Sequence, residues 1–183
     1  MGLLSTDDIF YDRINDKRVI EEWIKSNYNI YGNLTITDDF IVNCTGEVDV
    51  NNKSITSLTN GLFRWGKVGT DFNCTYCDKL TSLEGAPEKV GGYFSCSHCD
   101  KLETLKGSPE YVGKDFNCIM CNDLISLEGA PKKVGWNFNC NQCDNLESLK
   151  GVPKEVGWNF YCWGCENLKI ADSDRKKYKI VKK

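Results

Sequence analysis

Ten cysteines form five Cys-x-x-Cys pairs, a spacing at which thiols can bind zinc or exchange disulfides. The pairs begin at Cys74, Cys96, Cys118, Cys140 and Cys162, at a constant interval of 22 residues. Two successive pairs match a zinc ribbon, but so regular a recurrence is typical of a structural repeat. We expect the first thiol to be buried as a small apolar group and the second to bond to backbone groups. Reduced thiols without a bound metal are therefore predicted.

Catalytic chemistry has few candidates in this chain. His98 is the only histidine and lies between two of the cysteines, so a Cys–His nucleophile would have to use it. We interpret His98 as a surface residue, because no phosphate-binding glycine loop and no pair of acids outside the repeat accompanies it. The chain is predicted not to be an enzyme, with no catalytic residue and no cofactor.

Large aromatic side chains gather in the last repeats, at positions predicted to face solvent. Exposed tryptophan and tyrosine commonly dominate the binding energy of protein interfaces. The predicted binding residues are Trp136, Trp158, Tyr161, Trp163, Ile119, Asn139 and Asn141. A structural interpretation stays open, in which Trp136 and Trp158 pack along the repeats and cover an edge.

All of these residues are positioned by one repeating unit, V-G-x-x-F-x-C-x-x-C-x-x-L-x-x-L-x-G-x-P, here called a rung. The phenylalanine and the first cysteine are two residues apart, so they share one face of a strand. The later steps of three residues suit a turning arc, which the Gly-x-Pro segment ends. Units this short cannot bury a core alone and must stack on their neighbours.

The rung also resembles known repeat families. Its F-x-C-x-x-C-x-x-L segment resembles the L-x-L-x-x-C-x-x-L core of leucine-rich repeats. More specifically, LTSLEGAPEKVGGYFSC resembles a repeat family common in tailed bacteriophages and related viral or bacterial genomes. The resemblance covers roughly residues 20–170 and implies a β-rich, leucine-rich-repeat-like solenoid with an N-terminal helical cap. It implies no common activity. This chain departs from it at the second cysteine, where many relatives have asparagine, and at Trp136 and Trp158.

The pattern divides the chain into four parts. Residues 1–30 are predicted as a helical cap, because an apolar helical stripe runs through residues 16–26. Alternating apolar residues predict strands at 32–36 and 46–50. The remaining parts are degenerate rungs in residues 31–67, regular rungs in residues 68–168 and a basic C-terminal cap or tail in residues 169–183.

Charge and composition restrict the partners and the compartment. The net charge is −3, yet residues 169–183 hold seven basic and two acidic side chains, so the rest of the chain is acidic. An acidic body argues against phosphate-backbone binding by the rungs. No apolar run approaches the length of a membrane span, so no membrane partner is expected. Eleven cysteines without an export signal are typical of a reducing compartment, and a cytoplasmic location is predicted.

These observations predict a non-enzymatic protein-interaction module. The resemblance implies a viral protein, encoded by a phage. By analogy alone, we expect such a protein to bind and inhibit or redirect a host protein such as a defence component. One alternative is a nucleotide or nucleic-acid binder that stacks bases on the aromatic patch and holds phosphate with the basic tail. A second alternative is a zinc-binding Cys-x-x-Cys module. The sequence predicts no oligomeric state.

Overall fold

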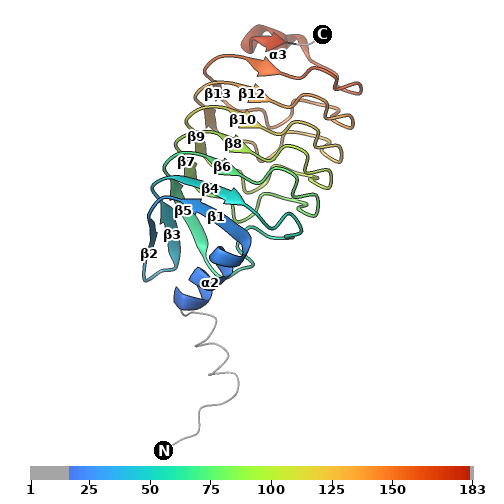
Figure 1. The fold of residues 1–183 in the computed structure, drawn as a ribbon. Helices are drawn as coiled ribbons and strands as arrows, with labels where there is room; N and C mark the ends of the chain where they lie inside the picture. Colours follow the sequence, from blue (N-terminus) through green and yellow to red (C-terminus); the bar gives the residue numbers. More distant parts are fainter. Residues whose placement is uncertain (1–16, 182–183) are drawn as a thin grey trace, which may run out of the picture.

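The computed structural model describes residues 17–181, which wind into an elongated β-solenoid (Figure 1). Two sheets run along it, and each regular rung contributes one two-residue strand to each. Sheet A contains, in order, β1 (Tyr28–Tyr31), β4 (Glu47–Val50), β6 (Phe72–Asn73), β8 (Phe94–Ser95), β10 (Phe116–Asn117), β12 (Phe138–Asn139), β14 (Phe160–Tyr161) and β15 (Ile180–Val181). Sheet B contains β2 (Leu34–Ile36), β3 (Ile41–Cys44), β5 (Arg64–Val68), β7 (Lys89–Val90), β9 (Tyr111–Val112), β11 (Lys133–Val134) and β13 (Glu155–Val156).

The core consists of columns of identical side chains, one from each rung. Phe94, Phe116 and Phe138 are fully buried, and their rings stack at centroid distances of 5.2 and 5.1 Å. The parallel strands pair these phenylalanines with one another, so equivalent residues lie side by side. The repeated leucines are buried with them, as are the valines before the glycines of every regular rung except the last. Because no rung closes a core alone, stability must come from these contacts between rungs.

The turn after each arc requires glycine. Gly107 has a φ of 89°, a conformation that L side chains rarely adopt. A Cβ at this position would also lie 2.5 Å from the backbone of Glu84 in the preceding rung. The glycine of the Gly-x-Pro segment therefore lets successive arcs approach closely.

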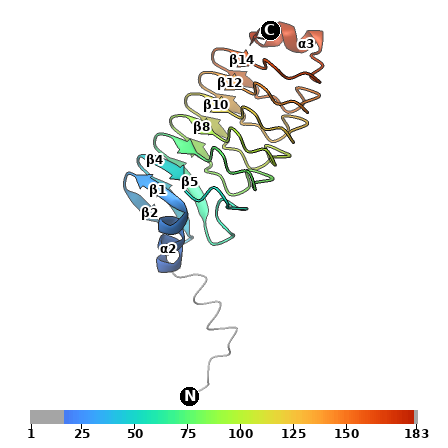
Figure 2. The ribbon, with the colours of Figure 1, turned by 45° about the vertical axis from the view of Figure 1, so that its right-hand side comes forward.

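The N-terminal end is closed by a helix and by antiparallel strands. Helix α2 (Lys17–Asn27) confirms the helix predicted at residues 16–26, and it buries Ile20 and Ile24 against the first rungs (Figure 2). The strands β1 and β4 pair antiparallel in sheet A, as do β2 and β3 in sheet B. The strands predicted at 32–36 and 46–50 correspond to β2 and β4.

The C-terminal end closes differently, because the described part of the basic tail forms a helix and a strand. Helix α3 (Asp172–Lys177) lies across the last rung, and β15 pairs in parallel with β14. Between them Tyr178 is buried, and its hydroxyl donates to the Pro153 carbonyl at 2.9 Å. The tail therefore extends sheet A by one strand.

The predicted β-rich solenoid with a helix near its N-terminus is confirmed, but each rung has more structure than expected. The sequence indicated one strand and an arc, whereas a second strand forms where Lys89–Val90 and its equivalents precede a glycine. Sheet B continues into the connection before residue 68 as β5. Within residues 17–181, neither helix has the length and apolar character needed to span a bilayer.

Candidate interaction surface

The paired cysteines form a buried thiol ladder that links neighbouring rungs. The second cysteine donates its S–H to the carbonyl of the first cysteine of the preceding rung, for example from Cys99 to Cys74 at 3.2 Å. The same bond joins Cys143 to Cys118 at 3.0 Å. All eleven cysteines are free thiols. The predicted bonding of the second thiol to backbone groups is confirmed, and the bond ties one rung to the next.

Burial keeps several thiols of the ladder protonated at neutral pH, whereas the hydrogen bond with Cys74 lowers the pKa of Cys99. Burial raises the pKa of Cys96, Cys118 and Cys140 well above the usual range of a thiol, and it raises the pKa of Cys77 to about 12. A protonated thiol is a poor nucleophile and a poor metal ligand. Among the described residues, no cluster of three or more histidine, cysteine or acidic side chains could hold a metal ion.

His98 lies on the arc at the surface, at the turn before the second cysteine. Its φ is 57°, and the equivalent residues Tyr76, Met120 and Gln142 are also left-handed. The imidazole is partly exposed and stacks on the Tyr76 ring at 4.5 Å. This placement agrees with the interpretation of His98 as a surface residue.

Trp136 and Trp158 lie at the corner where the chain passes from sheet B to sheet A. Their rings stack at 4.9 Å, with 4° between the planes. The column continues to Tyr93, whose ring meets Trp136 edge-on at 5.9 Å, and the Lys114 ammonium lies 4.9 Å from the Tyr93 centroid. Trp158 ends the column and stays 57% exposed. The pair thus packs along the stack and also presents one indole to solvent.

Tyr161 and Trp163 occupy a different face, on and beside the outer side of sheet A. Trp163 is 46% exposed, whereas Tyr161 is partly covered and its hydroxyl accepts a bond from the Asn159 side-chain amide at 3.1 Å. In the next strand Val181 is the register partner of Tyr161 and is itself exposed. An apolar surface therefore continues from the last regular rung onto β15.

The two predicted asparagines hold the backbone beneath this surface. The Asn139 side-chain oxygen accepts the Asn141 N–H at 3.1 Å, and the Asn141 side-chain oxygen accepts the Trp163 N–H at 2.7 Å. Ile119 lies one rung earlier, and its N–H donates to the Ser97 hydroxyl at 3.3 Å. Asn141 consequently positions Trp163. The side-chain carbonyl of Asn141 is used in this bond, so little of it is left to bind a partner.

The structure therefore divides the predicted patch into two groups, the tryptophan pair at the corner and the residues of the sheet A face. It also shows that residues of the predicted cap or tail lie next to the tryptophan pair. A cavity of about 630 Å³ adjoins Trp158 and is lined in part by Tyr178 and Lys179. The apolar pair Ile180–Val181, in an otherwise charged segment, was the available signal that the tail folds back.

Comparisons of the chain with protein-family models, with curated proteins and with solved structures found no match.

Proposed function

We propose that the protein is a non-enzymatic interaction module that binds a protein partner through the C-terminal end of the stack. The observation that carries the proposal is the exposure of two indoles, Trp158 and Trp163, on one rung. Large aromatic side chains are usually buried, and exposed ones are enriched at the centres of interfaces. Val181 extends the apolar surface on the Trp163 side, because it pairs with Tyr161 on the adjacent strand.

The architecture supports a binding role for this surface. Equivalent rungs stacked in register form a rigid platform, so an exposed side chain loses little further freedom when a partner binds. Trp158 is already oriented by its stack on Trp136, and the Trp163 backbone is held by Asn141. Little conformational entropy is therefore lost when these two side chains bind a partner.

The finer assignment rests on the resemblance of the rung to other repeats. We propose a leucine-rich-repeat-like protein of the phage type, which acts in the host cytoplasm. Its partner is a host protein, such as a defence component, whose activity it inhibits or redirects.

The test is capture of a partner from host lysate by the full chain and by a Trp158→Ala, Trp163→Ala double variant. Truncation of a tryptophan at the centre of an interface commonly costs about 2 kcal/mol or more of affinity, so capture should be lost. The matched control is a Tyr31→Ala, Ile125→Ala variant, which removes two equally exposed apolar side chains elsewhere. Circular dichroism verifies that both variants stay folded.

Unchanged capture by the folded tryptophan variant would contradict the proposal. Salt-sensitive binding of oligonucleotides that disappears in the same variant would instead favour the nucleic-acid alternative, because phosphate contacts release counterions.

A further inference from the structure

The two sheets end at different levels at the C-terminal end of the stack. Sheet A continues past the last regular rung, because β15 pairs with β14. Sheet B stops at β13, which pairs with β11 on one side and is the last strand of its sheet. The final rung thus has a covered strand on one side and an open strand edge on the other.

The open edge carries a backbone carbonyl whose equivalents in the earlier rungs accept a hydrogen bond from the next rung. The Gly135 N–H donates to the Val112 carbonyl at 2.8 Å, and the Gly157 N–H donates to the Val134 carbonyl at 3.0 Å. Val156 has the same position in the last rung, so its carbonyl faces the place where a further strand would lie. Its side chain is only half-buried, whereas Val112 and Val134 are fully buried.

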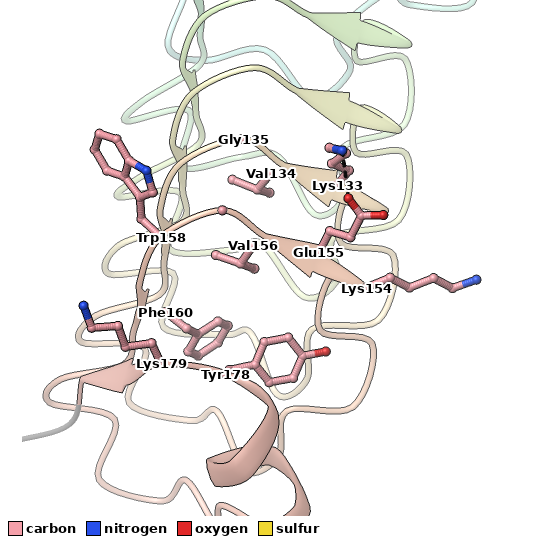
Figure 3. A pocket seen from close by; sticks show the side chains of 11 residues that line it. Lys133, Val134, Gly135, Lys154, Glu155, Val156, Trp158, Phe160, Tyr178 and Lys179 are labelled. Carbon is pink, nitrogen blue, oxygen red and sulfur yellow. Dashed lines mark ion pairs between the residues drawn. The ribbon is translucent and has the colours of Figure 1, made fainter.

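A groove lies over this edge. The cavity of about 630 Å³ is lined along one side by the whole of β13 and its flanking residues, from Lys154 to Trp158. Figure 3 shows Val156, Phe160 and Tyr178 forming its inner surface, with Trp158 and Lys154 on opposite sides. The groove offers an apolar floor and a strand edge, the two features that strand-addition sites combine.

We propose that this groove binds an extended peptide segment of the partner protein, which pairs with β13 as an additional parallel strand. The preferred segment has an acidic residue, then any residue, then a β-branched apolar residue and a glycine. This inference rests on the proposed function and assigns it a second contact site, beside Trp158.

The acidic residue is specified by the charge of the rim. Glu110 and Lys132 occupy one position in adjacent rungs and form an ion pair at 2.5 Å. Lys154 has that position in the last rung, is exposed and forms no ion pair with another described residue. An acid in the next strand would meet Lys154 as Glu110 meets Lys132. Lys179 adds a second positive charge to the groove.

The glycine is specified by sterics at the corner of the solenoid. A Cβ on Gly157 would lie 1.9 Å from the Gly135 carbonyl oxygen, and one on Gly135 would lie 2.0 Å from the Gly113 oxygen. Each of these glycines thus lies over the carbonyl of the preceding one. A residue stacked on Gly157 in the same register must also lack a side chain.

The probe is a capped peptide, Pro-Glu-Lys-Val-Gly-Gly, which copies residues 87–92 of the chain. In the proposed register its glutamate meets Lys154, its lysine meets Glu155 and its valine covers Val156. Titration into the ¹⁵N-labelled full chain should produce saturable shifts of the Val156 and Gly157 amide resonances. Two control peptides carry alanine in place of the first glycine, or lysine in place of the glutamate.

The alanine peptide should bind about tenfold more weakly or worse, because its methyl group has no space. The lysine peptide should bind about twofold to fivefold more weakly, as expected for one exposed ion pair. A Lys154→Glu variant should bind the lysine peptide more tightly than the glutamate peptide. It should still prefer glycine to alanine. That reversal depends on charge alone, so it does not require a variant that disturbs the fold.

Three results would overturn the inference. These are the absence of saturable shifts at millimolar peptide, equal binding of the alanine peptide, and self-association of the chain that already occupies the β13 edge. Trp163 lies outside the groove, so a Trp163→Ala variant tests the proposed function separately. Loss of partner capture in that variant, combined with no peptide binding, would leave the proposed function standing and remove only the strand site.

Discussion

The two ends of the solenoid differ in how completely their last rungs are covered. At the N-terminal end both sheets finish in an antiparallel strand, and α2 adds Ile20 and Ile24 to the core. An aromatic cluster seals it, in which the Trp65 ring lies 5.5 Å from Tyr28. At the C-terminal end one strand and a short helix cover sheet A, while β13 is left at the edge of sheet B. A stack requires a cover for its core, but it does not require one for every strand edge.

The first prediction concerns stability at alkaline pH. The thiol ladder lies in the regular rungs, so these rungs should lose stability at high pH more than the N-terminal end does. Thiols such as Cys118 and Cys140 have raised pKa values in the folded protein and a pKa near 8.5 when unfolded. Their contribution to stability is complete below about pH 8.5 and falls as pH rises toward the folded pKa. Each such thiol should reduce the unfolding free energy by about 1.4 kcal/mol per pH unit in that range.

Urea unfolding under reducing conditions at pH 8, 9 and 10 measures this effect. A Cys118→Ala variant should show a shallower pH dependence than the wild type, because one titrating thiol is gone. A constant unfolding free energy from pH 8 to 10 would show that the ladder is solvated.

Matched tryptophan truncations compare the two ends directly. Trp65→Ala should cost about 3–5 kcal/mol, because the indole is fully buried in the N-terminal cluster. Trp158→Ala should cost about 0.5–1.5 kcal/mol, the contribution of one aromatic stack. Chemical denaturation of both variants provides the values, and similar costs would mean that the C-terminal end is as closed as the other.

Valine truncations sharpen the comparison within sheet B. Val134→Ala should cost about 2 kcal/mol, from two buried carbon groups and the cavity that they leave. Val156→Ala should cost less than about 1 kcal/mol, because this side chain is already half-exposed at the sheet edge. Thermal unfolding of the two variants side by side tests the difference. If the valines prove equivalent, β13 is covered in solution.

The smallest effect is expected at the rim of the open end. The ion pair between Lys133 and Glu155 at 2.8 Å is exposed on both sides, so solvent screens it. Glu155→Gln should leave the melting temperature unchanged within experimental scatter. A clear decrease would mean that this pair stabilises the edge strand, and that the rim charges are not reserved for binding.

The periodic residues predicted the interior well, and the reason is physical. Phe116 and Cys118 recur at a fixed interval because each must meet its own copy in the next rung, so their pattern reports inside and outside. The α2 stripe is visible for the same reason. Among the strands of sheet B, β2 was predicted by its alternation, but the regular-rung strands were not, because a two-residue strand such as Lys89–Val90 is too short to alternate and has no apolar partner two residues on, as Phe116 has in Cys118.

The candidate surface was predicted only in part. The exposure of Trp158 and Trp163 follows from their rung positions, but the separation of the tryptophan pair from the sheet face depends on the corner between the sheets. Residues 169–183 were predicted as a cap or a tail without specified contacts, because their charge hides the apolar contacts that Tyr178 and Ile180 make with the core. The open edge of β13 results from unequal strand numbers in the two sheets, which no local sequence pattern encodes.

The alternating charges on the arcs restrict how many rungs such a chain can gain or lose in evolution. Glu84 pairs with Lys106, and Glu128 pairs with Lys150, each at 2.8 Å. The hexapeptide Ser-Leu-Glu-Gly-Ala-Pro occurs at residues 82–87 and again at 126–131, two rungs later. A duplication of one rung would place like charges on adjacent arcs, whereas a duplication of two rungs would preserve every pair. The unit of inheritance is therefore expected to be the doublet, so homologous chains should differ in length by even numbers of rungs.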